Sequence, residues 1–134
     1  MIRIKGIDHI VLRTANLDTM IGFYRDVLGC TVERQLDPAI GLVQLRAGAA
    51  LIDLVSLESE LGRAGGGPAG TTENNLDHFC LQLEKSSEES IREHLAKNGI
   101  EAGEFQRRYG AQGFGQSVYI QDPEGNTVEL RSEI

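Results

Sequence analysis

The sequence predicts an α+β fold in which two tandem copies of one βαβββ module form a curved mixed sheet with a central cleft. A hexapeptide recurs, a helical pattern ending at a glycine follows each copy, and each half closes on a strand with one carboxylate. The two copies are Ile7-Asp8-His9-Ile10-Val11-Leu12 and Leu76-Asp77-His78-Phe79-Cys80-Leu81. Because a four-stranded sheet with one helix has only one face covered, two copies are expected to abut and shelter an inner surface.

The first module is expected over residues 4–57. Its N-terminal apolar stretch leads directly into a strand, and the helix that follows is marked by apolar residues at helical spacing: Leu17, Met20, Ile21, Tyr24 and Leu28. Gly29 suits the left-handed position that closes a helix. Strand-like segments follow, and the last covers residues 50–55 and carries Asp53.

The second module is expected over residues 76–133. Ser86 and Glu89 offer a capping box for a helix that contains Ile91 and Leu95 and stops at Gly99. The final two strands are joined at a turn over residues 122–126, and the last strand carries Glu129. Residues 58–75 have no apolar period and are interpreted as a linker or mobile loop, so that the whole chain, residues 1–134, forms one domain.

Alternation along the strands predicts which side chains enter the cleft. Residues two apart share a face of a strand, and the helix takes the more apolar face. The inward set is therefore His9, Val11 and Arg13; Leu51, Asp53 and Val55; His78, Cys80 and Gln82; and Thr127, Glu129 and Arg131. Two imidazoles and two carboxylates are expected to converge.

This convergence indicates a divalent metal site with His9, His78 and Glu129 as ligands. Two histidines and one carboxylate leave coordination positions open, an arrangement that suits Fe and that Zn, Mn, Ni or Co also accept. Asp53 has a shorter side chain, so direct ligation, ligation through water, a hydrogen bond to a ligand and a role as general base all stay open for it.

Other inward residues have less specific readings. Tyr119 should share a face with Glu129, where its phenol would either orient a substrate oxygen or form a wall of the pocket. Arg13 and Arg131 could neutralise a carboxylate or phosphonate, but both lie near strand ends, and exposure to solvent is expected for both. Cys80 is interpreted as a small filler with no base beside it.

The order of these motifs resembles the vicinal oxygen chelate superfamily, which includes glyoxalase I, fosfomycin-resistance proteins, extradiol dioxygenases, methylmalonyl-CoA epimerase and bleomycin-binding proteins. The resemblance covers the whole chain and is carried by residues 8–12, 23–29, 76–78 and 122–130. It implies a glyoxalase-like fold of paired βαβββ modules, with metal ligands at His9, His78 and Glu129. A fourth family ligand maps to Asp53, where glyoxalase I members typically have glutamate.

The resemblance further implies a metal that chelates adjacent oxygens of a small substrate. A lactoylglutathione lyase-like lyase or isomerase is the favoured function, with Glu129, Asp53 and Tyr119 as the catalytic residues. The alternatives are an Fe(II) extradiol-type dioxygenase, a fosfomycin-modifying enzyme and a ligand-binding protein without catalysis, like the bleomycin-resistance proteins.

Composition restricts the partners. The net charge of −7 disfavours nucleic acid and membrane surfaces, and the two cysteines do not make a disulfide framework, so a cytoplasmic location is the default. A small-molecule substrate and a homodimer are expected, because exposed module edges favour pairing. Two glycine-rich segments, residues 62–70 and 109–115, are candidate lids or substrate walls.

Overall fold

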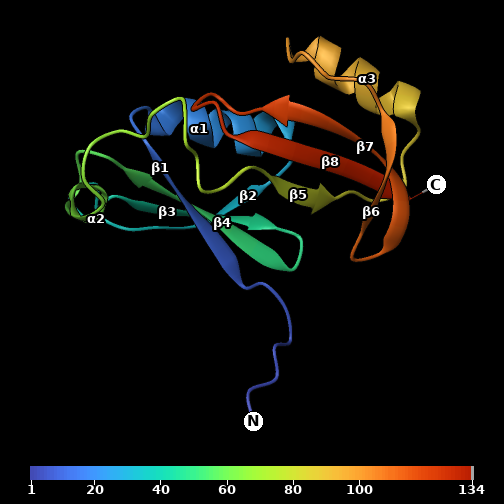
Figure 1. Cartoon of the computed structure of the whole chain (residues 1–134). Helices are drawn as coiled ribbons and strands as arrows, with labels where there is room; N and C mark the ends of the chain where they lie inside the picture. Colours follow the sequence, from blue (N-terminus) through green and yellow to red (C-terminus); the bar gives the residue numbers. More distant parts are fainter. Residues whose placement is uncertain (134) are drawn as a thin grey trace. The chain divides into compact units, whose positions relative to one another are not determined.

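The structure, a computed structural model, describes residues 1–133 and divides into two compact units, Met1–Ala69 and Gly70–Ile134 (Figure 1). Each unit contains a four-stranded mixed sheet and follows the order strand, helix, three strands. The predicted tandem βαβββ fold is thereby confirmed. Over residues 1–133, no helix is long and apolar enough to cross a membrane.

The sheet of unit 1 has the strand order β1-β4-β3-β2, with β1 (His9–Thr14), β2 (Thr31–Gln35), β3 (Leu42–Ala47) and β4 (Ala50–Ser56). The pair β1–β4 is parallel, and the other pairs are antiparallel. Its core is made by apolar side chains of β1, β3, β4 and the helical segment, among them Leu12, Tyr24, Leu45, Ile52 and Leu54. Strand β1 begins at His9, and Ile7 ahead of it is exposed.

The helical part of unit 1 is not one continuous α-helix. Helix α1 (Leu17–Gly22) passes directly into a π-helical turn, η1 (Phe23–Val27), so the helix widens before it ends. The Leu28 amide donates to the Phe23 carbonyl at 3.2 Å, five residues back, which is the π-helical hydrogen bond. Gly29 follows with φ of 76°, the left-handed conformation predicted for it.

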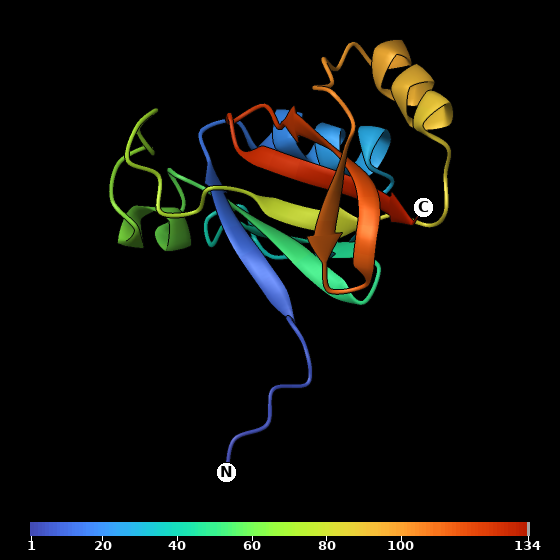
Figure 2. The same ribbon diagram turned by 45° about the vertical axis from the view of Figure 1, so that its right-hand side comes forward.

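The sheet of unit 2 repeats this topology with the order β5-β8-β7-β6. Its elements are β5 (Phe79–Gln82), α3 (Glu88–Lys97), β6 (Gln106–Gly110), β7 (Gly113–Gln121) and β8 (Thr127–Glu133), and β5–β8 is the parallel pair (Figures 1 and 2). The predicted cap is wrong by one residue, because Ser87 and not Ser86 accepts a hydrogen bond from the amide at the helix start. The Ser86 hydroxyl donates instead to the Glu84 carbonyl.

The turn between β7 and β8 forms as predicted. The Asp122 carboxylate accepts hydrogen bonds from the amides of Glu124 and Asn126, each at 2.9 Å, and from the Asn126 side chain at 2.8 Å. Gly125 has φ of 85°, which a residue with a side chain rarely adopts. These contacts fix the point where β8 begins, and with it the position of Glu129.

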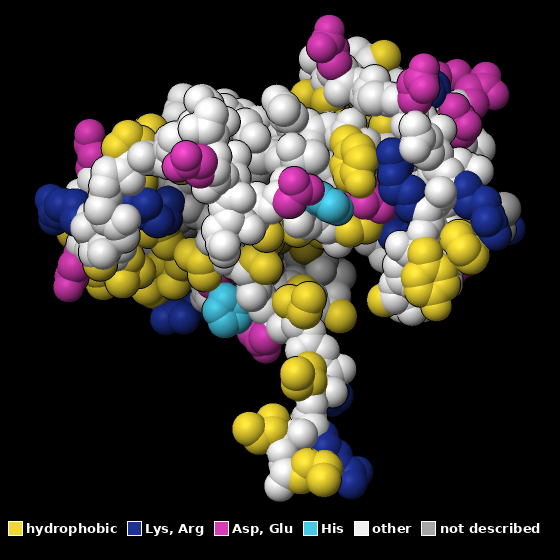
Figure 3. All heavy atoms as spheres, in the orientation of Figure 1, with side chains coloured by type: hydrophobic (Ala, Val, Ile, Leu, Met, Phe, Trp, Pro, Cys, Tyr) yellow, Lys and Arg dark blue, Asp and Glu magenta, His cyan; other side chains and the backbone are white. Residues whose placement is uncertain are grey.

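The glycine-rich segments are more ordered than predicted. Residues 58–75, predicted as a linker, include a short helix, α2 (Glu60–Ala64), whose first turn is capped by the Ser59 hydroxyl. Residues 109–115, the second candidate lid or substrate wall, form the tip of the β6–β7 hairpin. Ahead of β1, the N-terminal segment extends away from the sheet of unit 1 (Figures 1 and 3). Its apolar side chains Met1, Ile2 and Ile4 are exposed.

Candidate metal-binding site

The two units place a histidine and a carboxylate in the same register. In unit 1, Asp53 on β4 pairs with Val11, two residues after His9. In unit 2, Glu129 on β8 pairs with Cys80, two residues after His78. Because side chains alternate along a strand, each carboxylate lies on the same face of its sheet as the histidine of its own unit, as the sequence predicts.

Each histidine is oriented by the aspartate that precedes it. The His9 Nδ1 atom lies 2.6 Å from Asp8 Oδ1, and the His78 Nδ1 atom lies 2.6 Å from Asp77 Oδ2. A carboxylate on Nδ1 fixes the orientation of the ring and leaves Nε2 as the nitrogen that can bind a metal. The hydrogen bond that the His9 ring donates to the Asp8 carboxylate also raises the pKa of His9.

Unit 2 brings two of the predicted metal ligands together. The His78 Nε2 atom lies 3.3 Å from Glu129 Oε1, and the Glu129 side chain is almost fully buried. Two donors bound to one tetrahedral ion at about 2.0–2.1 Å would themselves be about 3.3 Å apart, so this pair has the spacing that a shared metal ion needs. The aromatic ring of Tyr119 packs edge-on against His78, with 5.1 Å between the ring centres.

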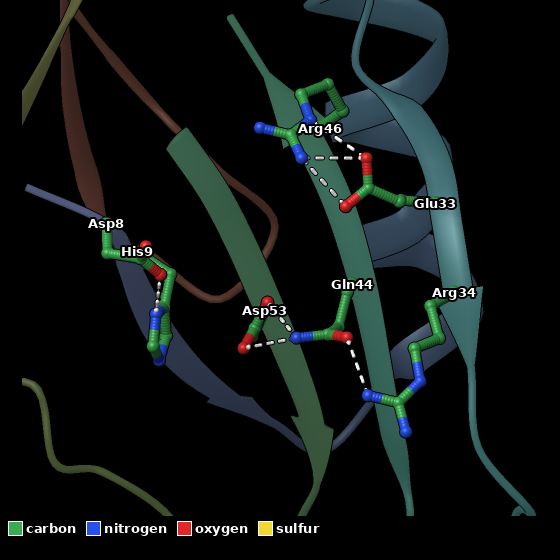
Figure 4. A network of polar contacts seen from close by, with 7 residues as sticks. All are labelled: Asp8, His9, Glu33, Arg34, Gln44, Arg46 and Asp53. Atoms are coloured by element: carbon green, nitrogen blue, oxygen red, sulfur yellow. Dashed lines mark hydrogen bonds and ion pairs between the residues drawn. The ribbon is translucent and has the colours of Figure 1, made fainter. Parts of the chain in front are cut away.

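Unit 1 holds its carboxylate differently (Figure 4). Asp53 is 3% exposed, and both of its oxygens accept hydrogen bonds from the Gln44 side-chain amide, at 3.3 and 3.2 Å. Arg34 donates in turn to the Gln44 side-chain oxygen at 3.4 Å. Gln44 is the antiparallel partner of Asp53, as Tyr119 is of Glu129. The Gln44 amide thus supplies the hydrogen bonds that the buried Asp53 carboxylate needs. The His9 ring is hydrogen-bonded to Asp8 and not to Asp53.

Tyr119 lies beside Glu129, as predicted from the hairpin. Burial, and after it the negative charge of Glu129, raises the pKa of the Tyr119 phenol. The guanidinium of Arg108 lies over the Tyr119 ring, 4.4 Å from its centre. The phenol therefore stays protonated at neutral pH, in the form that donates a hydrogen bond.

Cys80 shares the face of Glu129 and is not activated as a nucleophile. Partial burial of the thiol, followed by the Glu129 carboxylate, raises the pKa of Cys80 to about 12. The thiolate is the reactive form of cysteine, so this thiol is nearly inert at neutral pH. The interpretation of Cys80 as a filler without a catalytic base is consistent with this environment, although the residue is exposed.

The prediction that both inward arginines are exposed is wrong for Arg131 and only partly right for Arg13. Arg131 is 4% exposed and donates to the Gly113 carbonyl at 2.7 Å, because β7 and β6 carry glycines where its guanidinium lies. Arg13 is half-buried, and its guanidinium donates to the carbonyls of residues 62, 66 and 67. The segment at the end of α2 covers the Arg13 side chain. The position of Arg13 near a strand end gave no sign of this contact.

The donor set fits a metal only in part within each unit. Over residues 1–133, neither unit by itself assembles three His, Cys, Asp or Glu side chains into a metal site. Unit 2 supplies the pair His78 and Glu129, and unit 1 supplies His9 with its free Nε2 and Asp53 in the equivalent register. The nitrogen and carboxylate donors are those that Zn, Fe, Ni, Mn and Co bind.

Several residues around these donors were not singled out from the sequence. Asp8 and Asp77 orient the histidines, and the repetition of Asp-His in both modules was the available signal. Gln44, Arg108 and Ser117 come from inner and edge strands, and finding their contacts required the register of β2–β3, β3–β4 and β6–β7. That register depends on a bulge and on hairpin length, which composition does not reveal.

Residues 6–130 match the Glyoxalase/Bleomycin resistance protein/Dioxygenase superfamily, which is nearly the whole chain. The chain belongs to this superfamily. A curated relative, virulence protein STM3117 of Salmonella typhimurium, is 32% identical over 128 residues, covering 95% of this chain and 83% of the Salmonella protein.

Solved structures of superfamily proteins have the same fold. The crystal structure of STM3117 aligns with a TM-score of 0.75 at 27% identity, over 99% of this chain and 100% of that one. An integron cassette protein from the mobile metagenome of V. cholerae gives 0.74 at 26% identity, over 98% of both chains. A lactoylglutathione lyase from Agrobacterium tumefaciens gives 0.70 at 26% identity, over 97% of this chain and 95% of that one.

Proposed function

We propose that this chain is a metal-dependent lyase or isomerase of the glyoxalase type, in which His9, His78 and Glu129 bind one divalent cation. The observation that supports this most is the His78–Glu129 pair, spaced at 3.3 Å with Asp77 on the opposite ring nitrogen. His9 is the third ligand in this proposal because Asp8 orients it in the same way and leaves its Nε2 free. The ligands come from one chain or, in the homodimer that we also propose, from two.

The bound cation would act as a Lewis acid toward adjacent oxygens of the substrate. The protein groups around it have separate roles in this proposal. Tyr119, whose raised pKa keeps its phenol protonated, donates a hydrogen bond to a substrate oxygen. A carboxylate oxygen of Glu129 accepts the proton that is removed from the substrate carbon and returns it to the neighbouring carbon.

Asp53 is the second carboxylate of the proposed mechanism. The Gln44 amide donates to both of its oxygens, which fixes their direction and occupies both oxygens. Asp53 is therefore proposed as an auxiliary general base beside Glu129 and not as an essential ligand. A 2-oxo aldehyde adduct of a thiol, or a related oxygenated acid, is the proposed substrate class.

Metal content and turnover test the proposal together. Metal-free protein would be reconstituted separately with Zn, Ni, Mn, Co and Fe(II), its bound metal measured by elemental analysis, and each form assayed with the hemithioacetal of methylglyoxal and a thiol. One equivalent of metal per site and turnover that depends on the metal are expected. Stoichiometric metal with oxygen uptake on catechols would instead indicate the dioxygenase, and absence of stoichiometric metal binding would refute the proposed site.

A further inference from the structure

Unit 2 carries a buried positive charge whose role the proposed metal site does not explain. Arg131 lies on β8, two residues after Glu129, and is 4% exposed. Its Nη2 donates to the Gly113 carbonyl, but its buried Nε–H has no hydrogen-bond acceptor within the described part of the chain. An arginine side chain stays charged inside a protein, and a buried charge without a partner is costly.

The strands beside Arg131 are shaped to admit its guanidinium. A Cβ atom on Gly110 of β6 would lie 1.6 Å from Arg131 Nη1, and one on Gly115 of β7 would lie 2.6 Å from Nη2. Side chains at these two positions would exclude the guanidinium from its present place. The glycines at this hairpin tip thus leave the space that the buried guanidinium of Arg131 occupies, which explains why residues without side chains lie there.

A second cation lies on the same face of this sheet. Ser117 of β7 pairs with Arg131 on one side, and on the other side its hydroxyl and carbonyl accept hydrogen bonds from Arg108 Nη1 at 2.8 and 2.9 Å. Arg108 also contacts Tyr119 through its guanidinium. The Arg131 guanidinium lies over Gly115, the strand partner of Arg108, so the two cations are neighbours on this face of the sheet.

Among the residues that the structure describes, no carboxylate forms an ion pair with either of these two cations. Within residues 1–133, the arginines that form ion pairs with carboxylates are Arg25, Arg46 and Arg92, and Glu129 pairs with His78. The chain has an acidic net charge of −7, so carboxylates are abundant but are not used at this place. A ligand oxyanion would supply both the missing acceptor and the missing charge.

We propose that Arg131 and Arg108 form an oxyanion-binding subsite that holds the carboxylate or phosphoryl group of the substrate. The identity of the substrate in this inference rests on the proposed function: the substrate would have an acidic group at this subsite and two adjacent oxygens at the metal. The binding of the oxyanion itself does not require the metal. Planar guanidinium groups bind such oxygens in pairs, which makes arginine the suited residue.

The test uses the full chain without metal, so that failure of the metal site does not affect it. Two-dimensional NMR of the arginine Nε–H groups would follow a titration with inorganic phosphate, and a separate one with acetate, at constant ionic strength and neutral pH. Saturable shifts of the Arg131 and Arg108 signals are expected. Tighter binding of phosphate would assign a phosphoryl substrate, and tighter binding of acetate a carboxylate substrate.

Neighbouring arginines provide a matched control. Arg107 and Arg108 are adjacent on β6, and Arg107 faces the other way, with its guanidinium over Phe114. Arg108→Gln should weaken oxyanion binding at least about tenfold, while Arg107→Gln, with the same change in charge, should leave it unchanged. Arg131→Lys should also weaken binding, and if that variant does not fold, the Arg108 comparison decides.

Two results would overturn the subsite: shifts that do not saturate, or equal effects of the substitutions at residues 107 and 108. Metal binding is measured in the same variants to keep the two proposals apart. Arg108→Gln should retain the metal and lose the oxyanion, whereas Glu129→Gln should lose the metal and retain the oxyanion. Loss of both properties in Arg108→Gln, with the fold intact, would also refute a separate subsite.

Discussion

Units 1 and 2 place a histidine and a carboxylate on equivalent backbone positions, yet the two carboxylates have different partners. Asp53 is bound by the neutral amide of Gln44, whereas the longer Glu129 reaches the imidazole of His78. The strand pairing is the same in both units, so the difference arises from side-chain length and from the residue on the adjacent strand. The same backbone arrangement thus places one carboxylate beside an imidazole nitrogen and the other against the side-chain amide of Gln44.

The largest expected effect separates these two carboxylates. Glu129→Gln should lower metal affinity about a hundredfold or more and abolish turnover, because an amide is a poor ligand and a poor base. Asp53→Asn, the matched change in unit 1, should reduce turnover while metal affinity falls by less than about tenfold. Calorimetric titration with Zn and the hemithioacetal assay measure both. Equal losses of metal in the two variants would show that the units are functionally equivalent.

The second comparison concerns the interior arginines, which lie against glycines in both units. Gly110→Ala should destabilise the protein by about 2–3 kcal/mol, because the new Cβ would displace the buried guanidinium of Arg131. Gly65→Ala places a Cβ 2.5 Å from Arg13 Nε, but that side chain is half-buried and can move, so about 1 kcal/mol is expected.

Urea unfolding of both variants would test this order. Gly67→Ala is the control, because nothing lies within 4 Å of a Cβ at residue 67. A larger loss for Gly65→Ala than for Gly110→Ala would contradict the assignment of Arg131 as the more tightly enclosed cation.

A smaller effect is expected for Arg13→Met. This substitution removes the donors to the carbonyls of residues 62, 66 and 67 but keeps an aliphatic side chain over β1. A loss of about 1–2 kcal/mol is expected, and amide hydrogen exchange should accelerate in residues 60–67. Exchange in unit 2 is the internal control, and unchanged exchange in residues 60–67 would mean that the arginine does not hold this segment.

The smallest effect concerns the two thiols in metal-free protein. Burial raises the pKa of Cys30, and burial together with Glu129 raises that of Cys80, so both should react slowly with iodoacetamide near neutral pH. Glu129→Gln removes a negative charge, which lowers the pKa of Cys80 and speeds its alkylation a few-fold, while Cys30 stays unchanged. Mass spectrometry of the alkylated peptides measures both rates, and a slower reaction of Cys80 would contradict the sign of this interaction.

The sequence was sufficient to predict the parts of the fold that repeat. The hexapeptide, the glycines that close the helices and the Asp122 turn are local signals, and each has the predicted role. The face shared by Tyr119 and Glu129 followed from alternation along a two-strand hairpin. The π-helical turn at Phe23–Val27 was missed, because apolar spacing does not distinguish it from an α-helix over one turn.

Site residues that depend on several strands could not be predicted in the same way. The burial of Arg131 requires glycines on two other strands to lie beneath its guanidinium, and Gln44 meets Asp53 only once the β3–β4 register is known. Short local motifs carry no information on such pairing across a sheet. The polar neighbours Gln44 and Arg108 are therefore harder to predict from one sequence than the strand face on which Glu129 lies.

The repeated register has a consequence for how such proteins diverge. The same strand pairing is present in both units. Giving unit 1 the carboxylate and its neighbour that unit 2 has would therefore need only the substitutions Asp53→Glu and Gln44→Tyr, with no change in strand pairing. The duplicated architecture thus offers two equivalent strand positions for a carboxylate, and side chains at either position can change without a change in strand pairing.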